Sequence, residues 1–169
     1  MKILETDRLV LRWMSTDDSE FMLELLTDPT WIRFIGDRGA TTVDDASDYI
    51  VNKIVPMYGR IGFGLFLIEL KSDGRPIGIC GLIKRDALED VDIGFAFLPK
   101  FRANGYAYES ASAVMAYAKS ALGLSRVVAI TSPENDRSAK LLEKLGFKFE
   151  RMITLYENGS ENMLFGSND

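Results

Sequence analysis

The order of strands and helices in the middle of the chain most constrains its fold. Runs of apolar and β-branched residues bounded by turn residues predict strands at residues 62–70, 75–85, 91–98 and 125–132. The segment Lys71–Gly74 between the first two has residues typical of a hairpin turn. An alanine-rich helix that ends near Leu122 separates the last two. Short turns favour antiparallel neighbours and a strand–helix–strand crossover gives parallel ones, so this order predicts a mixed sheet.

Further elements are expected on both sides of this segment. The patterns predict strands at residues 8–13, 147–155 and 161–165 and helices at residues 15–26, 43–55 and 136–145. Asp28–Pro29 ends the first helix, Thr42 with Asp45 resembles a capping box at the start of the second, and Asn158–Gly159 marks the last turn. The chain is therefore expected to be an α/β protein, with an α+β mixed sheet of about seven strands and flanking helices. No repeat or long linker divides residues 1–169, so we expect a single domain.

Composition limits the class of partner. With 169 residues, of which 47% are hydrophobic, the chain can bury a sizeable core. A net charge of −5 argues against a nucleic-acid surface, which is normally basic, and favours a cationic substrate or a basic peptide. No apolar run approaches the ~18 residues that a membrane helix needs, and the first residues lack the apolar core of a signal peptide, so no membrane partner is expected.

The chain has a single cysteine, Cys80, which cannot form an internal disulfide, and this fits the cytoplasm. Its place in an apolar strand indicates a buried, unreactive thiol.

The chain contains no histidine. This removes histidine-based triads, histidine-rich metal sites and acid–base catalysis by imidazole from consideration, and we expect no metal. Any chemistry must use carboxylates, hydroxyls, backbone amides or a bound cofactor.

The loop before the alanine-rich helix has features of an anion site. A helix that begins near Asn104 or Gly105 directs free backbone N–H groups out of its first turn, where they attract phosphate. Gly105 lets a ligand approach closely, and Arg102 adds a positive charge. The alternative is that Gly105 only eases the turn from strand to helix while Arg102 is solvated. The segment is neither a P-loop nor a three-glycine dinucleotide fingerprint.

Two motifs and their flanks resemble a known family. Arg102–Ala107 resembles the R/Q-x-x-G-x-G/A signature of the GNAT acetyltransferase superfamily, and PENDRSAKLLEKLGF at residues 133–147 resembles its second marker. The segments ETDRLVLR, IGFAF and NGYAYES are similar to the RimJ/RimL-like branch, the ribosomal-protein N-terminal acetyltransferase-like proteins. The resemblance covers nearly the whole chain, with the motifs in the family's order.

The resemblance implies a fold and a reaction. It implies that the parallel pair of strands splays apart, and that acetyl-coenzyme A enters as co-substrate with its pantetheine arm in the gap. The acetyl group would pass by direct attack to a primary amine, either a protein N-terminus or a small molecule, in a monomer or homodimer. Cofactor contacts are then expected from residues Phe95, Phe97, Leu98, Arg102, Ala103, Asn104, Gly105, Tyr106, Ala107, Asn135 and Ser138. For the phenylalanines the contact would be through the main chain, because their alternation also suits side chains in the core.

Two residues are candidates for catalysis. Asp92 lies among small residues on one face of its strand, and its carboxylate is our candidate base for the attacking amine. The alternative is a solvated aspartate at a strand end. By the resemblance, Ser138 would lie near the thioester sulfur and assist the leaving thiolate, whereas Asn135 either contacts the coenzyme or only caps its helix. Many family members carry a tyrosine acid at the position of Leu142, so Ser138, solvent or proximity alone must serve here.

Other functions remain open from the sequence. A non-catalytic acyl-CoA-binding or sensor protein on the same fold is the alternative, since the tyrosine is missing. A nucleotide-binding or redox module is disfavoured by the missing fingerprints. Trp31, Ile32 and Phe34 either line the acceptor cleft or belong to the core.

Overall fold

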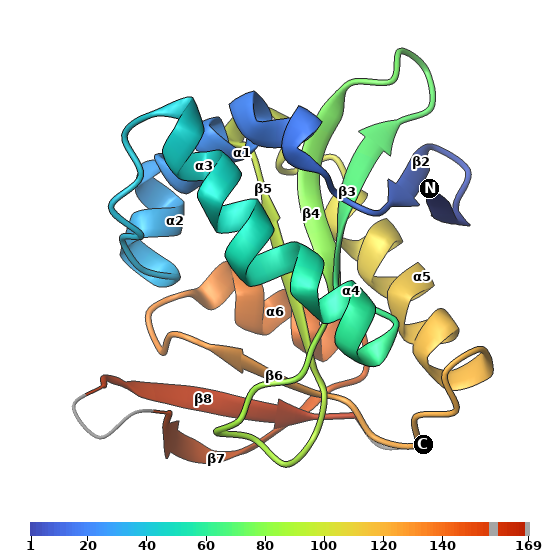
Figure 1. Ribbon diagram of the computed structural model, residues 1–169. Coiled ribbons are helices and arrows are strands. Elements are labelled where there is room, and N and C mark those ends of the chain that lie inside the picture. Colours follow the sequence, from blue (N-terminus) through green and yellow to red (C-terminus); the bar gives the residue numbers. More distant parts are fainter. Residues whose placement is uncertain (156–158, 168–169) are drawn as a thin grey trace.

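One eight-stranded sheet organises the computed structural model, which describes residues 1–155 and 159–167 (Figure 1). Its strands are β1 (Lys2–Glu5), β2 (Leu9–Arg12), β3 (Leu65–Leu70), β4 (Pro76–Ile83), β5 (Asp92–Phe97), β6 (Val128–Thr131), β7 (Lys148–Thr154) and β8 (Glu161–Gly166). They lie side by side in the order β1-β2-β3-β4-β5-β6-β8-β7. The seven expected strands are all present. The strand β1 is additional, and its four residues are too few to show a clear alternation.

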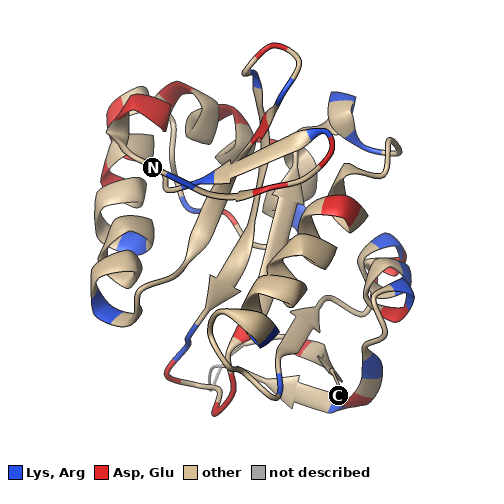
Figure 2. Cartoon of the chain, turned by 90° about the vertical axis from the view of Figure 1, so that its right-hand side faces the viewer, with Lys and Arg blue, Asp and Glu red and all other residues tan. Residues whose placement is uncertain are grey.

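Helices cover both faces of the sheet. They are α1 (Ser19–Leu26), α2 (Pro29–Phe34), α3 (Val43–Tyr49), α4 (Val55–Ile61), α5 (Tyr106–Ser120) and α6 (Asp136–Lys144), with short helical turns η1 (Thr16–Asp18) and η3 (Pro99–Phe101) and a π-helical segment η2 (Ile50–Ile54). In Figure 2 the sheet stands between the N-terminal helices on one side and α5 and α6 on the other. No helix in the described ranges is long and apolar enough to span a membrane.

The sheet is antiparallel except where β5 meets β6. Those two strands are parallel, and they are paired at a single position, Asp92 with Val128. Beyond Asp92 the strands diverge, while β4 continues to pair with β5 along its whole length. The mixed sheet with a splayed parallel pair is therefore confirmed.

The helical region after Thr42 is longer than expected. Thr42 and Asp45 form the expected capping box, but the helical run continues to Ile61 instead of ending near Val55. Within it, the amide of Val55 donates to the carbonyl oxygen of Ile50, five residues back. Pro56 has no N–H and cannot continue the ordinary ladder, which accounts for the wider π turn just before it.

Two other local expectations have clear outcomes. Cys80 is fully buried on β4, which confirms the expected burial, and burial raises the pKa of its thiol to about 12. The short helix α2 was not expected, although Asp28 accepts a hydrogen bond from the Trp31 amide and Pro29 occupies its first turn, as is typical of a helix start. The expected Asn158–Gly159 turn includes a residue outside the described ranges.

Candidate functional site

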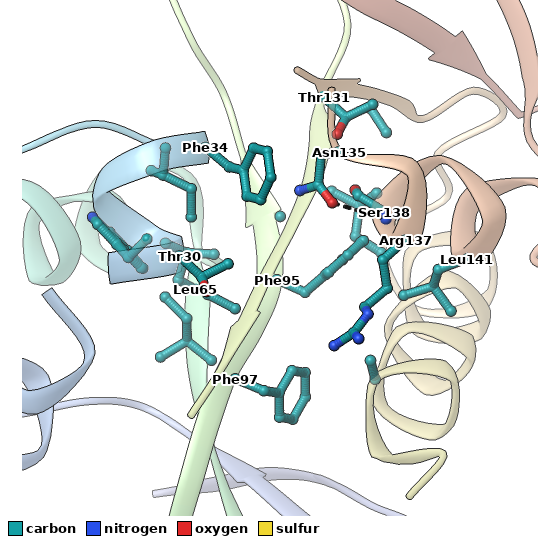
Figure 3. Close-up of a pocket in the computed structure, with 18 of the residues that line it drawn as sticks. Thr30, Phe34, Leu65, Phe95, Phe97, Thr131, Asn135, Arg137, Ser138 and Leu141 are labelled. Atoms are coloured by element: carbon teal, nitrogen blue, oxygen red, sulfur yellow. Dashed lines mark hydrogen bonds between the residues drawn. The ribbon is translucent and has the colours of Figure 1, made fainter. Parts of the chain in front are cut away.

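A cavity of about 940 Å³ opens where β5 and β6 diverge. One of its walls comes from α2, α3, η2 and α4, and the other from the start of α5 and from α6, with β5 between them (Figure 3). Figure 3 shows the side chains of Phe95 and Phe97 pointing from β5 toward α5 and α6. Phe97 is buried and Phe95 is half-buried, so both line the cavity while packing on the core.

The main chain of β5 offers free polar groups to this cavity. The Leu98 amide donates to the Ile77 carbonyl oxygen of the β4 segment at 3.0 Å. Main-chain groups alternate in direction along an antiparallel strand, so those of Phe95 and Phe97 point away from β4 and toward the gap. Of these, the Phe97 carbonyl oxygen already accepts from Arg102, which leaves the Phe97 amide and both Phe95 groups for a ligand. The strand β6 does not pair with β5 there. An extended ligand arm can therefore hydrogen-bond to β5 as an added strand does.

The main-chain groups of Leu98, in contrast, are already hydrogen-bonded within the protein. Its amide is bonded to Ile77, and its carbonyl oxygen accepts from the Phe101 amide at 3.0 Å. Both main-chain groups of Leu98 are therefore used within the fold, and its contact with the coenzyme stays a prediction. The cause is the turn η3, which closes directly after β5 and which the strand pattern alone does not reveal.

The first turn of α5 presents a second set of free donors. Gly105 precedes the helix in the left-handed conformation, with φ of 81°, and in the described part of the chain no side chain caps the helix. The amides of Tyr106, Ala107 and Tyr108 have no hydrogen-bond partner among the described residues, and all three residues line the cavity. Free amides and the helix dipole make this turn an anion site facing the gap.

Arg102 and Asn104 are placed differently from the simple expectation. The Arg102 guanidinium turns away from this turn: it forms an ion pair with Asp28 at 3.0 Å and donates to the Phe97 carbonyl oxygen at 2.8 Å. Asn104 is not part of the cavity wall, and its carbonyl oxygen accepts from Arg8. Ala103, with φ of 64°, lies on the wall. The Arg102 charge is therefore used to hold α2 against the end of β5.

Asp92 lies at the point where the strands diverge. Its side chain is 1% exposed, and both carboxylate oxygens lie 3.3 Å from Nε of Arg85. Burial raises the pKa of Asp92 to about 6, although the neighbouring Arg85 charge opposes the shift. The alternative of a solvated aspartate is therefore wrong. A buried carboxyl on a cavity wall that titrates near neutral pH has the properties of a general base.

Asn135 and Ser138 lie together at the start of α6, as Figure 3 shows. The Asn135 side chain accepts a hydrogen bond from the Ser138 amide at 3.2 Å and so caps α6. The Ser138 hydroxyl has no hydrogen-bond partner among the described residues, and both residues line the cavity. Leu142, which occupies the tyrosine position, is buried.

Several cavity residues were missed by the sequence patterns. Arg137 extends from α6 into the space beside Phe97 (Figure 3), and the Lys144 ammonium lies 4.2 Å from the centre of the Tyr108 ring. On the opposite wall are Arg38 and Lys53. Single basic residues carry no spacing signal, so only the fold brings these together.

The apolar residues after Pro29 have different places. Trp31 and Phe34 line the cavity, whereas Ile32 is 40% exposed and lies outside the lining. The side chain of Trp31 is also part of the core, so this residue both lines the cavity and packs in the core.

Comparison with known proteins identifies the family of the chain. A family model described as "Acetyltransferase (GNAT) domain" matches residues 8–148. The chain is 31% identical over 163 residues to the uncharacterized N-acetyltransferase YoaA of Bacillus subtilis, covering 94% of this chain and 90% of YoaA. It is 29% identical over 167 residues to the uncharacterized N-acetyltransferase p20 of Bacillus licheniformis, with 97% and 92% covered.

Solved structures show the same fold at low sequence identity. An acetyltransferase from Agrobacterium tumefaciens superposes with a TM-score of 0.84 at 21% identity, covering 100% of this chain and 95% of that one. RimL, a ribosomal L7/L12 α-N-protein acetyltransferase solved in complex with coenzyme A, superposes with a TM-score of 0.83 at 15% identity, with 99% and 98% covered. The RimJ/RimL-like resemblance is thus matched at the level of the fold. The family match over residues 8–148 and the similarity to YoaA show that this chain belongs to the GNAT acetyltransferase family.

Proposed function

We propose that residues 1–169 act as one N-acetyltransferase domain that moves an acetyl group from acetyl-coenzyme A to a primary amine. The observation that carries this proposal is the meeting of two sets of unpaired donors in one cavity. The main chain of Phe95 and the amide of Phe97 face the gap, and the free amides of Tyr106, Ala107 and Tyr108 form its phosphate-binding end. A long ligand with a peptide-like arm and a pyrophosphate matches both.

The positive charge near the pyrophosphate comes from residues other than Arg102. Arg137 and Lys144 line the same wall as the first turn of α5, and neither forms an ion pair with a described residue. Side chains without a fixed partner can reach a phosphate without breaking an existing bond. Arg137 and Lys144 therefore replace Arg102 in this role.

The acid–base chemistry falls to Asp92 and Ser138. An amine attacks a thioester only after losing its proton, and Asp92 accepts that proton, directly or through water, once it is ionised above about pH 6. An amide on β5, near Phe97, stabilises the charge that develops on the thioester oxygen. The uncommitted Ser138 hydroxyl donates to the departing thiolate, in the place of the tyrosine that Leu142 replaces.

The alternative is a protein that binds acyl-coenzyme A without turning it over, because Leu142 leaves the tyrosine position without a proton donor. A panel of primary amines separates the two functions. Wild-type protein is incubated with acetyl-coenzyme A and each amine, and free thiol is measured with time. Thiol release that needs an amine supports the enzyme. Tight binding of acetyl-coenzyme A without release for any amine supports the binder.

A further inference from the structure

The wall across β5 from the coenzyme side has a charge opposite to that of the whole chain. The net charge of the chain is −5, yet two exposed cations, Arg38 and Lys53, line this wall. Neither forms a hydrogen bond or ion pair with a described residue. The acids of the wall are already paired, Asp28 with Arg102 and Asp92 with Arg85. This part of the cavity therefore has unpaired positive charge.

The π-helical segment η2 places one of these cations on the wall. Tyr49, Lys53, Ile54 and Met57 all line the cavity, and they are three, four or five residues apart along the helical run, which puts them on one face.

Apolar side chains line the same cavity as these cations and Asp92. The residues that line it include Phe34, Ile35, Leu65, Ile79 and Ile83. Phe34 and Leu65 lie on the same side of β5 as Thr30 of α2 in Figure 3. A ligand on this side can meet two cations, apolar side chains and the carboxyl of Asp92.

We infer that the acceptor is a primary amine that also carries a carboxylate and an apolar body. This inference rests on the proposed function and names its substrate class. The carboxylate binds Arg38 and Lys53, because a guanidinium and an ammonium are strong partners for that group. The apolar body packs on the wall, and the amine lies toward Asp92. A polyamine would bring positive charge against these cations and is disfavoured.

The test uses amines matched in shape and different in charge. Leucine is compared with leucine methyl ester and with isopentylamine, and a dipeptide with glutamate in second place is compared with its glutamine counterpart. Rates are expressed per neutral amine, because esterification lowers the pKa of the amino group. We expect kcat/KM to be about tenfold higher for the members with a free carboxylate, the size of one good charge-assisted contact.

Variants connect this preference to the wall. Arg38→Ala and Lys53→Ala are each expected to raise KM about tenfold for the carboxylate acceptor and to leave the ester unchanged. Lys119→Ala, at the exposed end of α5, is the matched control. Circular dichroism and acetyl-coenzyme A affinity establish that each variant is folded.

The outcomes separate the two claims. Equal or better rates for the ester and isopentylamine, or equal effects of the variants on both acceptors, overturn the carboxylate inference and leave the acetyltransferase intact. Absence of acetylation for every amine, in protein that binds acetyl-coenzyme A, overturns the proposed function itself. A preference confined to the dipeptides shows that the carboxylate belongs to an acidic peptide, not a free amino acid.

Discussion

Asp92 is the residue whose environment makes the clearest prediction. Its folded pKa of about 6 lies above the ordinary value because of burial, so the ionised base forms as the pH rises through 6. The kcat/KM of wild-type protein should therefore rise near pH 6 and again near the pKa of the amine. Asp92→Asn should lose the rise near pH 6 and keep the second. Superimposable pH profiles for the two proteins would remove Asp92 from the mechanism.

The raised pKa of Asp92 can also be checked without an activity assay, through the pH dependence of the free energy of unfolding. The folded protein holds the Asp92 proton more tightly than the unfolded chain, whose pKa is near 3.8. Its contribution to the free energy of unfolding should therefore fall as the pH rises from about 4 to about 6 and stay constant above that. Urea unfolding of wild type and Asp92→Asn across this range measures the difference.

Arg137 is proposed to supply positive charge to the pyrophosphate of the coenzyme in place of Arg102. Its guanidinium lines the cavity beside Phe97, and Arg102 is committed to Asp28. Arg137→Ala should weaken coenzyme A binding about three- to tenfold, with a smaller loss at high salt because the contact is electrostatic. Lys140→Ala on the same helix, outside the cavity lining, should bind as wild type does. Calorimetry at two salt concentrations measures the affinity of each variant for coenzyme A. Equal affinities of Arg137→Ala and Lys140→Ala would contradict the role of Arg137.

At the scale of elements, the start of α5 is the proposed coenzyme-binding element. Gly105→Glu is a poor test because φ of 81° is strained for any side chain, and a Cβ there would lie 3.3 Å from Arg8 Nη2. Ala107→Glu instead adds bulk and negative charge one residue into the helix, on the cavity wall. It should weaken coenzyme A binding by at least about a hundredfold, since it places like charges together where wild type has free amides.

The matched control is Ala116→Glu, at an exposed position of the same helix. Both substitutions put glutamate in a helix at similar cost to helix propensity. Thermal unfolding should show two folded proteins, and calorimetry should show a binding defect in Ala107→Glu alone. A defect of equal size in both would mean that the α5 first turn is not the binding element.

The link between α2 and β5 acts at the scale of the whole molecule, because Asp28 and Arg102 join segments 74 residues apart. Asp28 both caps α2 and pairs with Arg102, and its side chain is 7% exposed. Asp28→Asn keeps an acceptor for the cap but loses the charge, and it should lower the free energy of unfolding by about 1–2 kcal/mol. Asp28→Ala loses both and should cost about 1 kcal/mol more.

Urea unfolding measures these differences, with Asp48→Asn, exposed on α3, as the control expected within about 0.5 kcal/mol of wild type. Equal stability of Asp28→Asn and wild type would show that the ion pair contributes nothing to the fold.

The sequence predicted what local patterns determine. The meander, the crossover and the free first turn of α5 all follow from alternation, turn residues and the glycine before a helix. It did not predict the partner of Arg102, because Asp28 is distant in the chain, nor the π turn, whose cause is a single proline in an otherwise ordinary helix. The basic wall formed by Arg38 and Lys53 likewise exists only once α2 and η2 are folded against the sheet.

The central claim is that this chain transfers an acetyl group from acetyl-coenzyme A to an amine. The most direct measurement is the mass of the amine after incubation with acetyl-labelled coenzyme and wild-type protein, together with the amount of free thiol. The account predicts an amine heavier by one labelled acetyl group and one thiol released for each, with neither formed when Ala107→Glu replaces wild type. Bound coenzyme with an unmodified amine, across the whole panel, would contradict it.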